Sequence, residues 1–315
     1  MIVKRSQLLL VVLCCSLMSF GQQLEHYTQY QYNQFLINPA LTGYKKCIDI
    51  KSGYRFQWIG IDGAPRSGFV NVSSPIKLGK RSRSPNAVKY GIGAQIKTDA
   101  LGPWKKTETH VTFGAKFTLS RYTKLSYGIS AGMKQIGFNS GSVTTTVPDP
   151  AVFNAQRSLI FPDAQVGIWL TTKKAYYGAS IHNLFGNAIR NVGDDNSFQR
   201  HYYFTAGQKF KVDNGWYFIP SVMVMKTKRV PFDGHLSFIF DYENTFALGI
   251  GLRRTDAITA QIRFKLFDFI SIGYSFDYII SKLQNRSWQT QEITMGYNSC
   301  SGYGSSGTAG CPTFE

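Results

Sequence analysis

Histidine and cysteine are the residue types in this sequence that are best suited to metal binding or catalysis. The histidines are scattered along the chain instead of being paired at ligand spacing: His26, His110, His182, His201 and His235. The sequence holds no HExxH zinc motif, no GxSxG nucleophile turn and no phosphate-binding P-loop. Gly91-x-Gly93 and Gly249-x-Gly251 lie in strand-like segments and lack the helix that a dinucleotide site requires. We therefore expect no catalytic residue, no cofactor and no metal site.

The cysteines indicate a disulfide. Of the five, Cys14 and Cys15 fall in the N-terminal apolar run, which leaves Cys47, Cys300 and Cys311. An exported protein matures in an oxidising compartment, so one pair is expected to be bridged. A Cys300–Cys311 bond would close a small loop in the tail, whereas a Cys47–Cys300 bond would join the two ends of the main domain. Free thiols are the third alternative, and a zinc site would lack the usual paired CxxC spacing.

The N-terminus has the pattern of a secretory signal peptide over residues 1–21. Lys4 and Arg5 precede the apolar run Leu8–Phe20, and Ser19-Phe20-Gly21 supplies small residues for cleavage before Gln22. The run is shorter than the roughly 20 residues that a membrane-spanning helix needs. A lipoprotein signal at Cys14 or Cys15 is the alternative, but small residues do not precede either cysteine.

Alternation of apolar and polar residues dominates the rest of the chain and predicts an all-β fold. Gly (30), Tyr (18) and Phe (23) are abundant, and only 17% of residues are charged. We expect about fourteen strands of ~9–15 residues, longer than is usual in soluble sheets and long enough to cross a bilayer. They are predicted to begin near residues 46, 66, 88, 107, 124, 162, 175, 200, 215, 232, 244, 257, 268 and 288. An even number of such strands predicts a closed antiparallel transmembrane β-barrel over residues 46–298.

The connections indicate which end of the barrel faces the periplasm. Even-numbered strands are followed by short turns such as Thr172–Lys174 and Tyr242–Asn244, with the stretch Gly79–Ala87 as an exception. Odd-numbered strands precede the longer segments Phe138–Pro162 and Leu184–Gln199. Outer-membrane barrels have short periplasmic turns and longer outer loops. Tryptophans at strand ends would form the aromatic girdles of such a barrel: Trp58, Trp104, Trp216 and Trp288.

The net charge of +17 falls to +15 without Lys4 and Arg5. Basic residues spread over strands and turns, in an exported chain, argue against nucleic-acid binding. They would suit a lumen wall, outer-membrane lipid or an acidic partner. A water-filled lumen with basic residues on the inward face would conduct anions, as in a diffusion porin: Lys116, Lys209, Arg263 and Lys265.

Two segments are candidates for partner binding. Residues 22–45 are too polar for lipid and too aromatic for a free linker, so we expect them to fold into the periplasmic mouth or to dock a partner there. A simple lead-in to the first strand is the alternative. On that strand Arg55 shares the polar face, and Asp62-Gly63-Ala64-Pro65 predicts a tight turn. The candidate partner-binding residues are Tyr27, Tyr30, Asn38, Pro39, Arg55, Trp58, Asp62 and Pro65.

The strings Tyr27–Gly43 (YTQYQYNQFLINPALTG) and Tyr54–Pro65 (YRFQWIGIDGAP) resemble the N-terminal signature of the PorP/SprF family. The similarity extends more loosely over residues 24–298. The resemblance implies an outer-membrane barrel of the type IX secretion and gliding machinery of Bacteroidetes. The tail, residues 299–315, departs from the family pattern because members tend to end soon after the last strand.

The resemblance implies a non-enzymatic role with type IX secretion components as partners. Members of one type support secretion or surface anchoring of a cargo adhesin, and members of the other type associate with the periplasmic ring and peptidoglycan-linked components. The sequence does not separate these two roles, and the diffusion porin is the rival of a different class.

Overall fold

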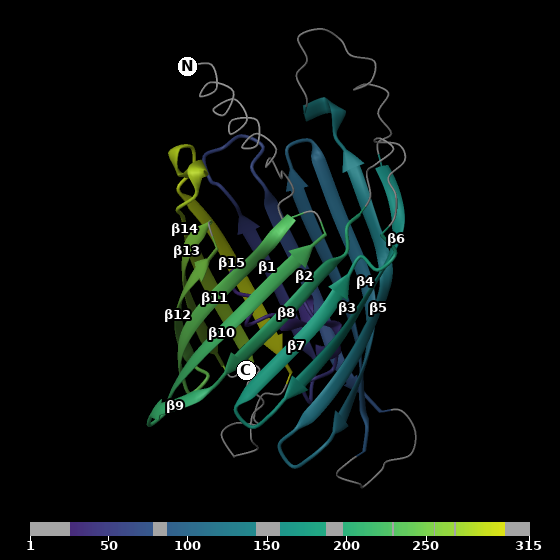
Figure 1. Cartoon of the computed structure of the whole chain (residues 1–315), viewed down its shortest axis with the longest axis vertical. Coiled ribbons are helices and arrows are strands. Elements are labelled where there is room, and N and C mark those ends of the chain that lie inside the picture. The colour runs from purple at the N-terminus through teal and green to yellow at the C-terminus, as the bar shows by residue number, and fades with distance from the viewer. Residues whose placement is uncertain are drawn as a thin grey trace, which may run out of the picture.

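The computed structural model shows one closed barrel of antiparallel strands (Figure 1). The structure describes residues 26–77, 87–142, 158–186, 198–228, 230–254, 256–267 and 269–299. The strands are β1 (Asp49–Phe56), β2 (Arg66–Ile76), β3 (Lys89–Leu101), β4 (Trp104–Thr118), β5 (Lys124–Phe138), β6 (Ser158–Thr171), β7 (Ala175–His182), β8 (His201–Gln208), β9 (Phe210–Asp213), β10 (Trp216–Thr227), β11 (Val230–Tyr242), β12 (Phe246–Arg253), β13 (Ala257–Leu266), β14 (Ile270–Ile279) and β15 (Gln289–Asn298). Short 3-10 turns are η1 (Gln34–Leu36), η2 (Pro39–Leu41), η3 (Ser140–Ser142) and η5 (Lys282–Asn285).

The barrel has fourteen strands because β8 and β9 are two parts of one. Both pair with β10, in the same register, on either side of Lys209. In this register Lys209 lies opposite Ile219, and the neighbouring Gln208 lies opposite Pro220, which has no backbone N–H to donate across the ladder. Pairing of β15 with β1 and of β10 with β11 completes the ring. The prediction of a closed, antiparallel, fourteen-stranded barrel is confirmed.

The strand positions also agree with the predicted ones. The largest difference is at β6, which begins at Ser158 instead of residue 162. Residues 1–25, which include the predicted signal peptide, lie outside the described residues, as do residues 300–315 of the tail. No helix in the described parts of the chain is long and apolar enough to cross a membrane.

The two ends of the barrel differ in their connections. The end where β1 begins, here the short-turn end, carries the tight turns at 119–123, 172–174 and 243–245. The opposite end, here the long-loop end, carries the connections between β1 and β2, β5 and β6, β7 and β8, and β14 and β15. Trp58, Trp104 and Trp288 lie at the long-loop end and Trp216 at the short-turn end.

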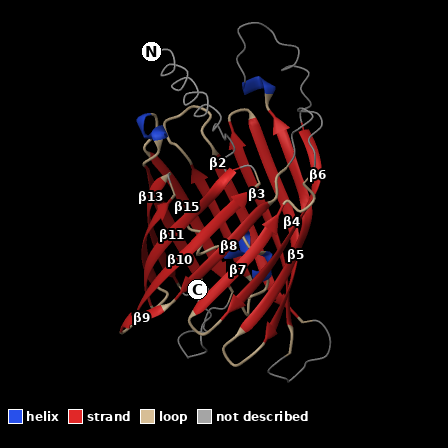
Figure 2. Cartoon of the chain, in the orientation of Figure 1, coloured by secondary structure: helices blue, strands red, loops and turns tan. Residues whose placement is uncertain are grey.

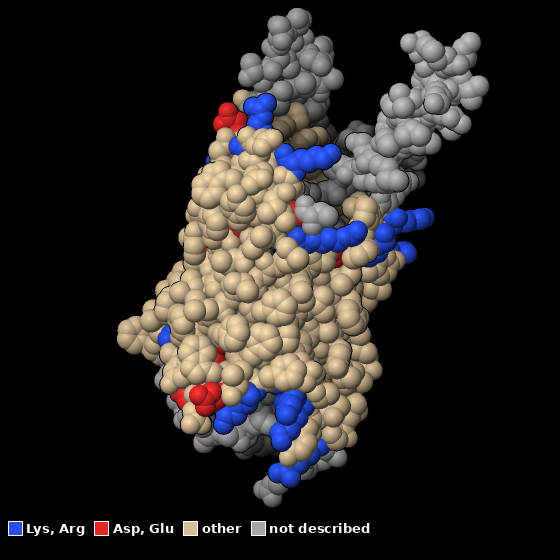
Figure 3. Space-filling view, turned by 60° about the vertical axis from the view of Figure 1, so that its left-hand side comes forward, with Lys and Arg blue, Asp and Glu red and all other residues tan. Residues whose placement is uncertain are grey.

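Side chains alternate between an apolar outer face and a mostly polar inner face. On β4, Val111 and Phe113 are exposed, whereas His110 and Thr112 are buried in the lumen. Lys and Arg side chains visible in Figure 3 lie mainly toward the two ends of the molecule, with uncharged residues between them. This is the surface expected of a barrel that is surrounded by hydrocarbon at mid-height.

The lumen is occupied by the segment that precedes β1. Residues 26–43 are all buried, and their two 3-10 turns lie inside the ring of strands (Figure 2). We call residues 26–44 the plug segment. The side of the membrane that this segment faces stays a prediction, but its described part lies within the barrel and is enclosed by the wall.

Candidate functional site

The plug segment passes through the lumen from the long-loop end to the short-turn end. Near its start, His26 forms an ion pair with Asp233 near the beginning of β11, with an Nε2–Oδ2 distance of 2.7 Å. Near its end, the Tyr44 hydroxyl donates to Thr171 at the end of β6 (3.0 Å), and Lys116 donates to the Tyr44 carbonyl (2.6 Å). The segment therefore contacts the wall at both ends.

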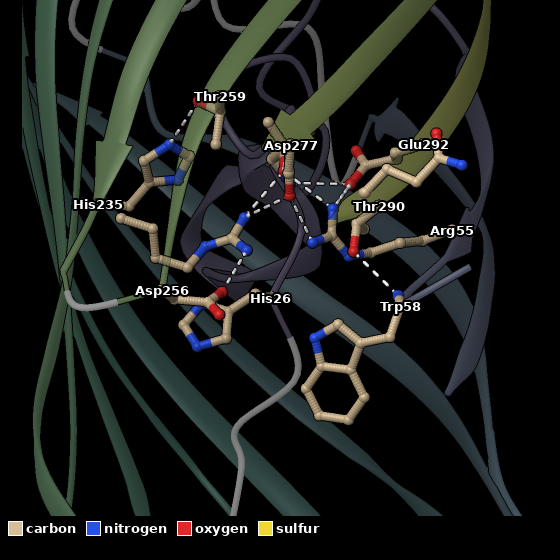
Figure 4. Close-up of polar contacts among 12 residues, drawn as sticks. His26, Arg55, Trp58, His235, Asp256, Thr259, Asp277, Thr290 and Glu292 are labelled. Atoms are coloured by element: carbon tan, nitrogen blue, oxygen red, sulfur yellow. Dashed lines mark hydrogen bonds and ion pairs between the residues drawn. The ribbon is translucent and has the colours of Figure 1, made fainter. Parts of the chain in front are cut away.

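A charged cluster holds the plug segment near the long-loop end (Figure 4). This Thr28 cluster consists of Thr28, Arg55, Arg253, Asp277 and Glu292. The Thr28 hydroxyl lies 2.8 Å from both oxygens of Asp277 and accepts from Arg55 Nη1 and Arg253 Nη2, each at 2.9 Å. The Thr28 amide donates to Glu292 at 2.8 Å. One residue of the plug segment thus joins strands β1, β12, β14 and β15.

The Thr28 cluster is closely paired in charge. Arg55 lies 2.6 Å from Asp277 and 3.1 Å from Glu292, and Arg253 lies 3.1 Å from Asp277. All four charged side chains are about 99% buried or more. Buried charges are tolerated when they are paired and hydrogen-bonded. Removing one member would leave its partner's charge buried and unpaired, which strongly destabilises the folded state. The cluster therefore fixes the position of Thr28 strongly.

Four glycines form a groove for the plug segment across the opposite wall. Gly91, Gly114, Gly128 and Gly167 are direct cross-strand neighbours on β3, β4, β5 and β6, and we call them the glycine row. A Cβ atom added at Gly128 would lie 2.1 Å from the Pro39 carbonyl oxygen. Glycine is needed in these strands for space, because the backbone of the plug segment passes directly against them.

Close approach also occurs at the other three members of the glycine row. A Cβ at Gly91 would lie 2.5 Å from Gly43 Cα, and one at Gly167 would lie 2.1 Å from Asn38 Oδ1. At Gly114 the nearest atoms, at 3.0 Å, belong to Thr42. The inner wall thus matches the shape of residues 38–43.

Asn38 and Pro39 form the turn that lies in the glycine row. The Asn38 side chain accepts from the Ala40 amide (3.0 Å), which caps the turn η2, and Pro39 occupies its first position. The Asn38 amide group donates to the carbonyls of Ile168 (3.0 Å) and Ala179 (3.2 Å) in the wall. A single asparagine therefore shapes the turn and anchors it to β6 and β7.

Apolar side chains of the plug segment pack against an apolar patch of the inner wall. Phe35 and Leu41 belong to one buried cluster with Trp169, Ile219 and Ile239 of the wall. Trp169 stacks on Tyr176 with ring centroids 4.8 Å apart. These apolar residues are exceptions on an inner face that is mostly polar, and the plug segment packs directly against them.

A pocket remains between the plug segment and β1 near the short-turn end. Its lining includes Tyr32, Phe35, Lys45, Asp49 and Lys51. Burial and the neighbouring Lys51 ammonium lower the pKa of Lys45 to about 7, despite its 2.7 Å ion pair with Asp49. Because this pKa lies below its usual value, the folded state becomes more favourable as the pH rises above 7.

The predicted partner-binding residues fall into two groups. Tyr27, Tyr30, Asn38, Pro39 and Arg55 are buried in the lumen, where they connect the plug segment to the wall. The other three, Trp58, Asp62 and Pro65, lie in the connection between β1 and β2 at the long-loop end.

Within the second group, Trp58 is half-buried and Pro65 is buried. Asp62 is exposed. Gly63 has a positive φ of 70°, as the predicted tight turn requires, and its carbonyl accepts from the Gly102 amide at 2.8 Å. The role of either group in binding a partner stays a prediction.

Two of the basic residues expected to line an open pore contact the plug segment instead. Lys116 binds the Tyr44 carbonyl, and the Arg263 guanidinium lies 4.4 Å from the centre of the Tyr32 ring. Arg263 also pairs with Asp241 at 3.0 Å. Lys209 lies over the Tyr217 ring at 4.0 Å. The basic lumen face therefore binds polypeptide and aromatic groups of the same chain.

Cys47 is disulfide-bonded, whereas Cys300 and Cys311 lie outside the described residues. The pairing therefore stays a proposal. Within the described ranges, no group of three or more histidine, cysteine or acidic residues is arranged to hold a metal ion.

The sequence contained a signal for the glycine row that the alternation pattern alone did not reveal. Gly114 and Gly128 lie equally far from Arg121 along the chain, and Arg121 precedes the strand predicted to begin near residue 124. A hairpin centred on that residue places the two glycines opposite each other, as observed. The Thr28 cluster had no such signal, because its members come from five separate segments.

Comparison with solved structures shows that the fold is similar to that of outer-membrane β-barrels. The CymD monoaromatic hydrocarbon channel has a TM-score of 0.51 at 10% identity, over 89% of this chain and 94% of that chain. The Pseudomonas putida toluene transporter TodX has a TM-score of 0.50 at 9% identity, over 88% and 98% of the two chains. At this identity the likeness concerns the fold alone.

Among curated protein sequences, none matches this chain. The family comparison is more specific. The pattern described as type IX secretion system membrane protein PorP/SprF matches residues 19–297, which include the plug segment and every strand of the barrel up to β15. The chain belongs to the PorP/SprF family of type IX secretion system membrane proteins.

Proposed function

We propose that this protein is a plugged, non-enzymatic scaffold in the outer membrane that supports secretion or surface anchoring of a cargo adhesin by the type IX system. The observation that carries this proposal is the occupied lumen. A shape-matched glycine row and a buried charged cluster hold a segment of the same chain along the length of the barrel. An open pore has no need of either feature.

In this proposal the long-loop end faces outward and presents the connection between β1 and β2 to its partner. That connection holds Trp58, Asp62 and Pro65. The backbone of this connection is hydrogen-bonded; for example, the Gln57 amide donates to the Pro65 carbonyl at 3.0 Å. An ordered loop with an exposed acidic tip is suited to recognise a basic or polar surface.

The test is a secretion assay in cells that carry Trp58→Ala and Asp62→Ala together in place of the wild-type protein. We expect the barrel to insert at its normal level and the amount of adhesin on the cell surface to fall several-fold. Lys282→Ala and Arg286→Ala, in another exposed part of the same end, form the control. Normal surface adhesin in the test strain would count against the proposal and would favour a role in docking periplasmic ring components at the short-turn end.

A diffusion channel is the second candidate, and the likeness in fold to hydrocarbon channels supports it. Ion conductance across a planar bilayer distinguishes the two functions. We expect the wild-type protein to show little ion conductance, and deletion of residues 26–42 to create an anion-selective pore. Steady conductance by the wild-type protein would favour the channel.

A further inference from the structure

Two adjacent turns at the short-turn end combine positive charge with an aromatic ring. The turn between β4 and β5 carries Arg121 and Tyr122 and leads into Lys124, the first residue of β5, and the turn between β6 and β7 carries Lys173 and Lys174. Pairing of Lys124 with Thr171 brings the two turns side by side. Arg121 lies 5.3 Å and Lys173 lies 5.1 Å from the centre of the Tyr122 ring. We call these five residues the basic turn site.

The positive charges of the basic turn site are accessible to an anionic ligand. Arg121, Lys173 and Lys174 are exposed, and Lys124 is half-buried. Among the described residues, none of these four cationic side chains forms an ion pair with a carboxylate. Neither turn contains an acidic residue. The local charge of +4 is therefore not balanced within these turns.

An apolar strip begins beside the basic turn site on the outer face of the barrel. Phe117, Leu125, Leu170 and Tyr177 are successive cross-strand partners on β4, β5, β6 and β7. Phe117 and Tyr177 are exposed, and the other two are half-buried. The strip runs around the wall directly next to the turns that carry the charge.

We propose that the basic turn site binds the phosphate headgroup of an anionic phospholipid, whose acyl chains pack against the strip Phe117–Leu125–Leu170–Tyr177. The ligand must be anionic at one end and apolar along its length, which a lipid satisfies and a soluble acidic protein does not. Tyr122 is exposed in the turn that ends β4, and tyrosine is a residue type that is enriched where membrane proteins meet headgroups. Arg121 and Lys173 both lie within cation–π distance of this ring, and this contact orders their charges for the phosphate.

The test uses the full-length protein in detergent micelles with phosphatidylglycerol as the probe, and native mass spectrometry counts the lipid molecules retained. We expect Arg121→Gln combined with Lys173→Gln to lower the affinity for phosphatidylglycerol roughly tenfold, because each basic residue near an anionic surface contributes to lipid attraction. The matched control is Lys77→Gln with Lys89→Gln, which removes the same charge from exposed positions at the same end. Both variants are first checked for folding by the change in gel mobility on heating.

Two outcomes support the proposal and two overturn it. Loss of lipid by the test variant but not by the control supports the site, and so does a smaller loss with Tyr122→Ala. Equal retention by the test and control variants overturns it. Displacement of the lipid by millimolar inorganic phosphate also overturns it, because the strip would then contribute nothing to binding. These measurements do not depend on the secretion role, so the two proposals can fail separately.

Discussion

At the scale of single residues, the inner wall is specialised to hold one segment of its own chain. The glycine row removes side chains where the turn at Asn38 and Pro39 approaches, and the Thr28 cluster supplies charges where the segment begins. Period-two alternation predicted which residues face inward, for example Arg55. It could not predict what those residues contact, because the contacts join segments more than 200 positions apart in sequence, such as Thr28 and Asp277.

The glycine row can be tested with one added methyl group. Gly128→Ala places a Cβ against the Pro39 carbonyl, and overpacking of this kind costs ~1–3 kcal/mol. We expect the plug segment to loosen and to become sensitive to added protease, while the barrel stays folded. Gly234→Ala is the control, because the nearest neighbour of its Cβ lies at 4.0 Å. Equal protease resistance in both variants would contradict the assigned role of the row.

The Thr28 cluster predicts a large effect from the loss of one charge. Asp277→Asn leaves Arg55 and Arg253 with only Glu292 and Asp256 as acidic partners, and breaking a buried ion pair in this way costs ~3–5 kcal/mol. The midpoint of urea unfolding in micelles, followed by tryptophan fluorescence, measures the change. Asp62→Asn at the exposed turn is expected to leave the midpoint unchanged. A similar midpoint for Asp277→Asn and the wild type would mean that the cluster contributes little.

At the scale of the elements, sequence reasoning located the strands well because lipid outside and polar groups inside impose a strict period of two. It did not anticipate the interruption at Lys209, which is next to the position opposite Pro220, or the inward apolar residues Ile219 and Met223. Those residues pack against the plug segment, so their position follows from a contact that the strand pattern does not contain. The sequence predicted that residues 22–45 fold into the periplasmic mouth or dock a partner there, but it did not predict that the segment extends through the lumen to the other end.

The register of the closing strands makes a prediction about the disulfide. Asp49 pairs with Asn298, and the Ser299 amide donates to the Ile48 carbonyl at 3.0 Å. Continuing this register would place position 300 opposite Cys47, so we expect a Cys47–Cys300 bond. Peptide mapping under non-reducing conditions should recover that pair, and Cys311→Ser should leave it intact. Recovery of Cys47 linked to Cys311 would overturn the assignment.

At the scale of the whole molecule, the difference between the two ends sets an orientation. Short turns at one end and longer connections at the other predict that Asp62 faces outward and Lys173 faces the periplasm. A membrane-impermeant maleimide should label Asp62→Cys on intact cells and Lys173→Cys only after the outer membrane is permeabilised. Labelling of the wild-type protein measures the background from its own cysteines. The reverse labelling pattern would invert the orientation and remove the basis of the proposed partner surface.

The path of the plug segment has a consequence for the order of assembly. Residues 26–44 are synthesised before any strand, yet the wall encloses them only after β15 has paired with β1. Thr28 joins β1, β12, β14 and β15, so its contacts become complete only when the final strand is in place. Closure of the barrel and full anchoring of the plug segment therefore depend on the same residues, so a variant that loses the Thr28 contacts also weakens the junction between the first and last strands.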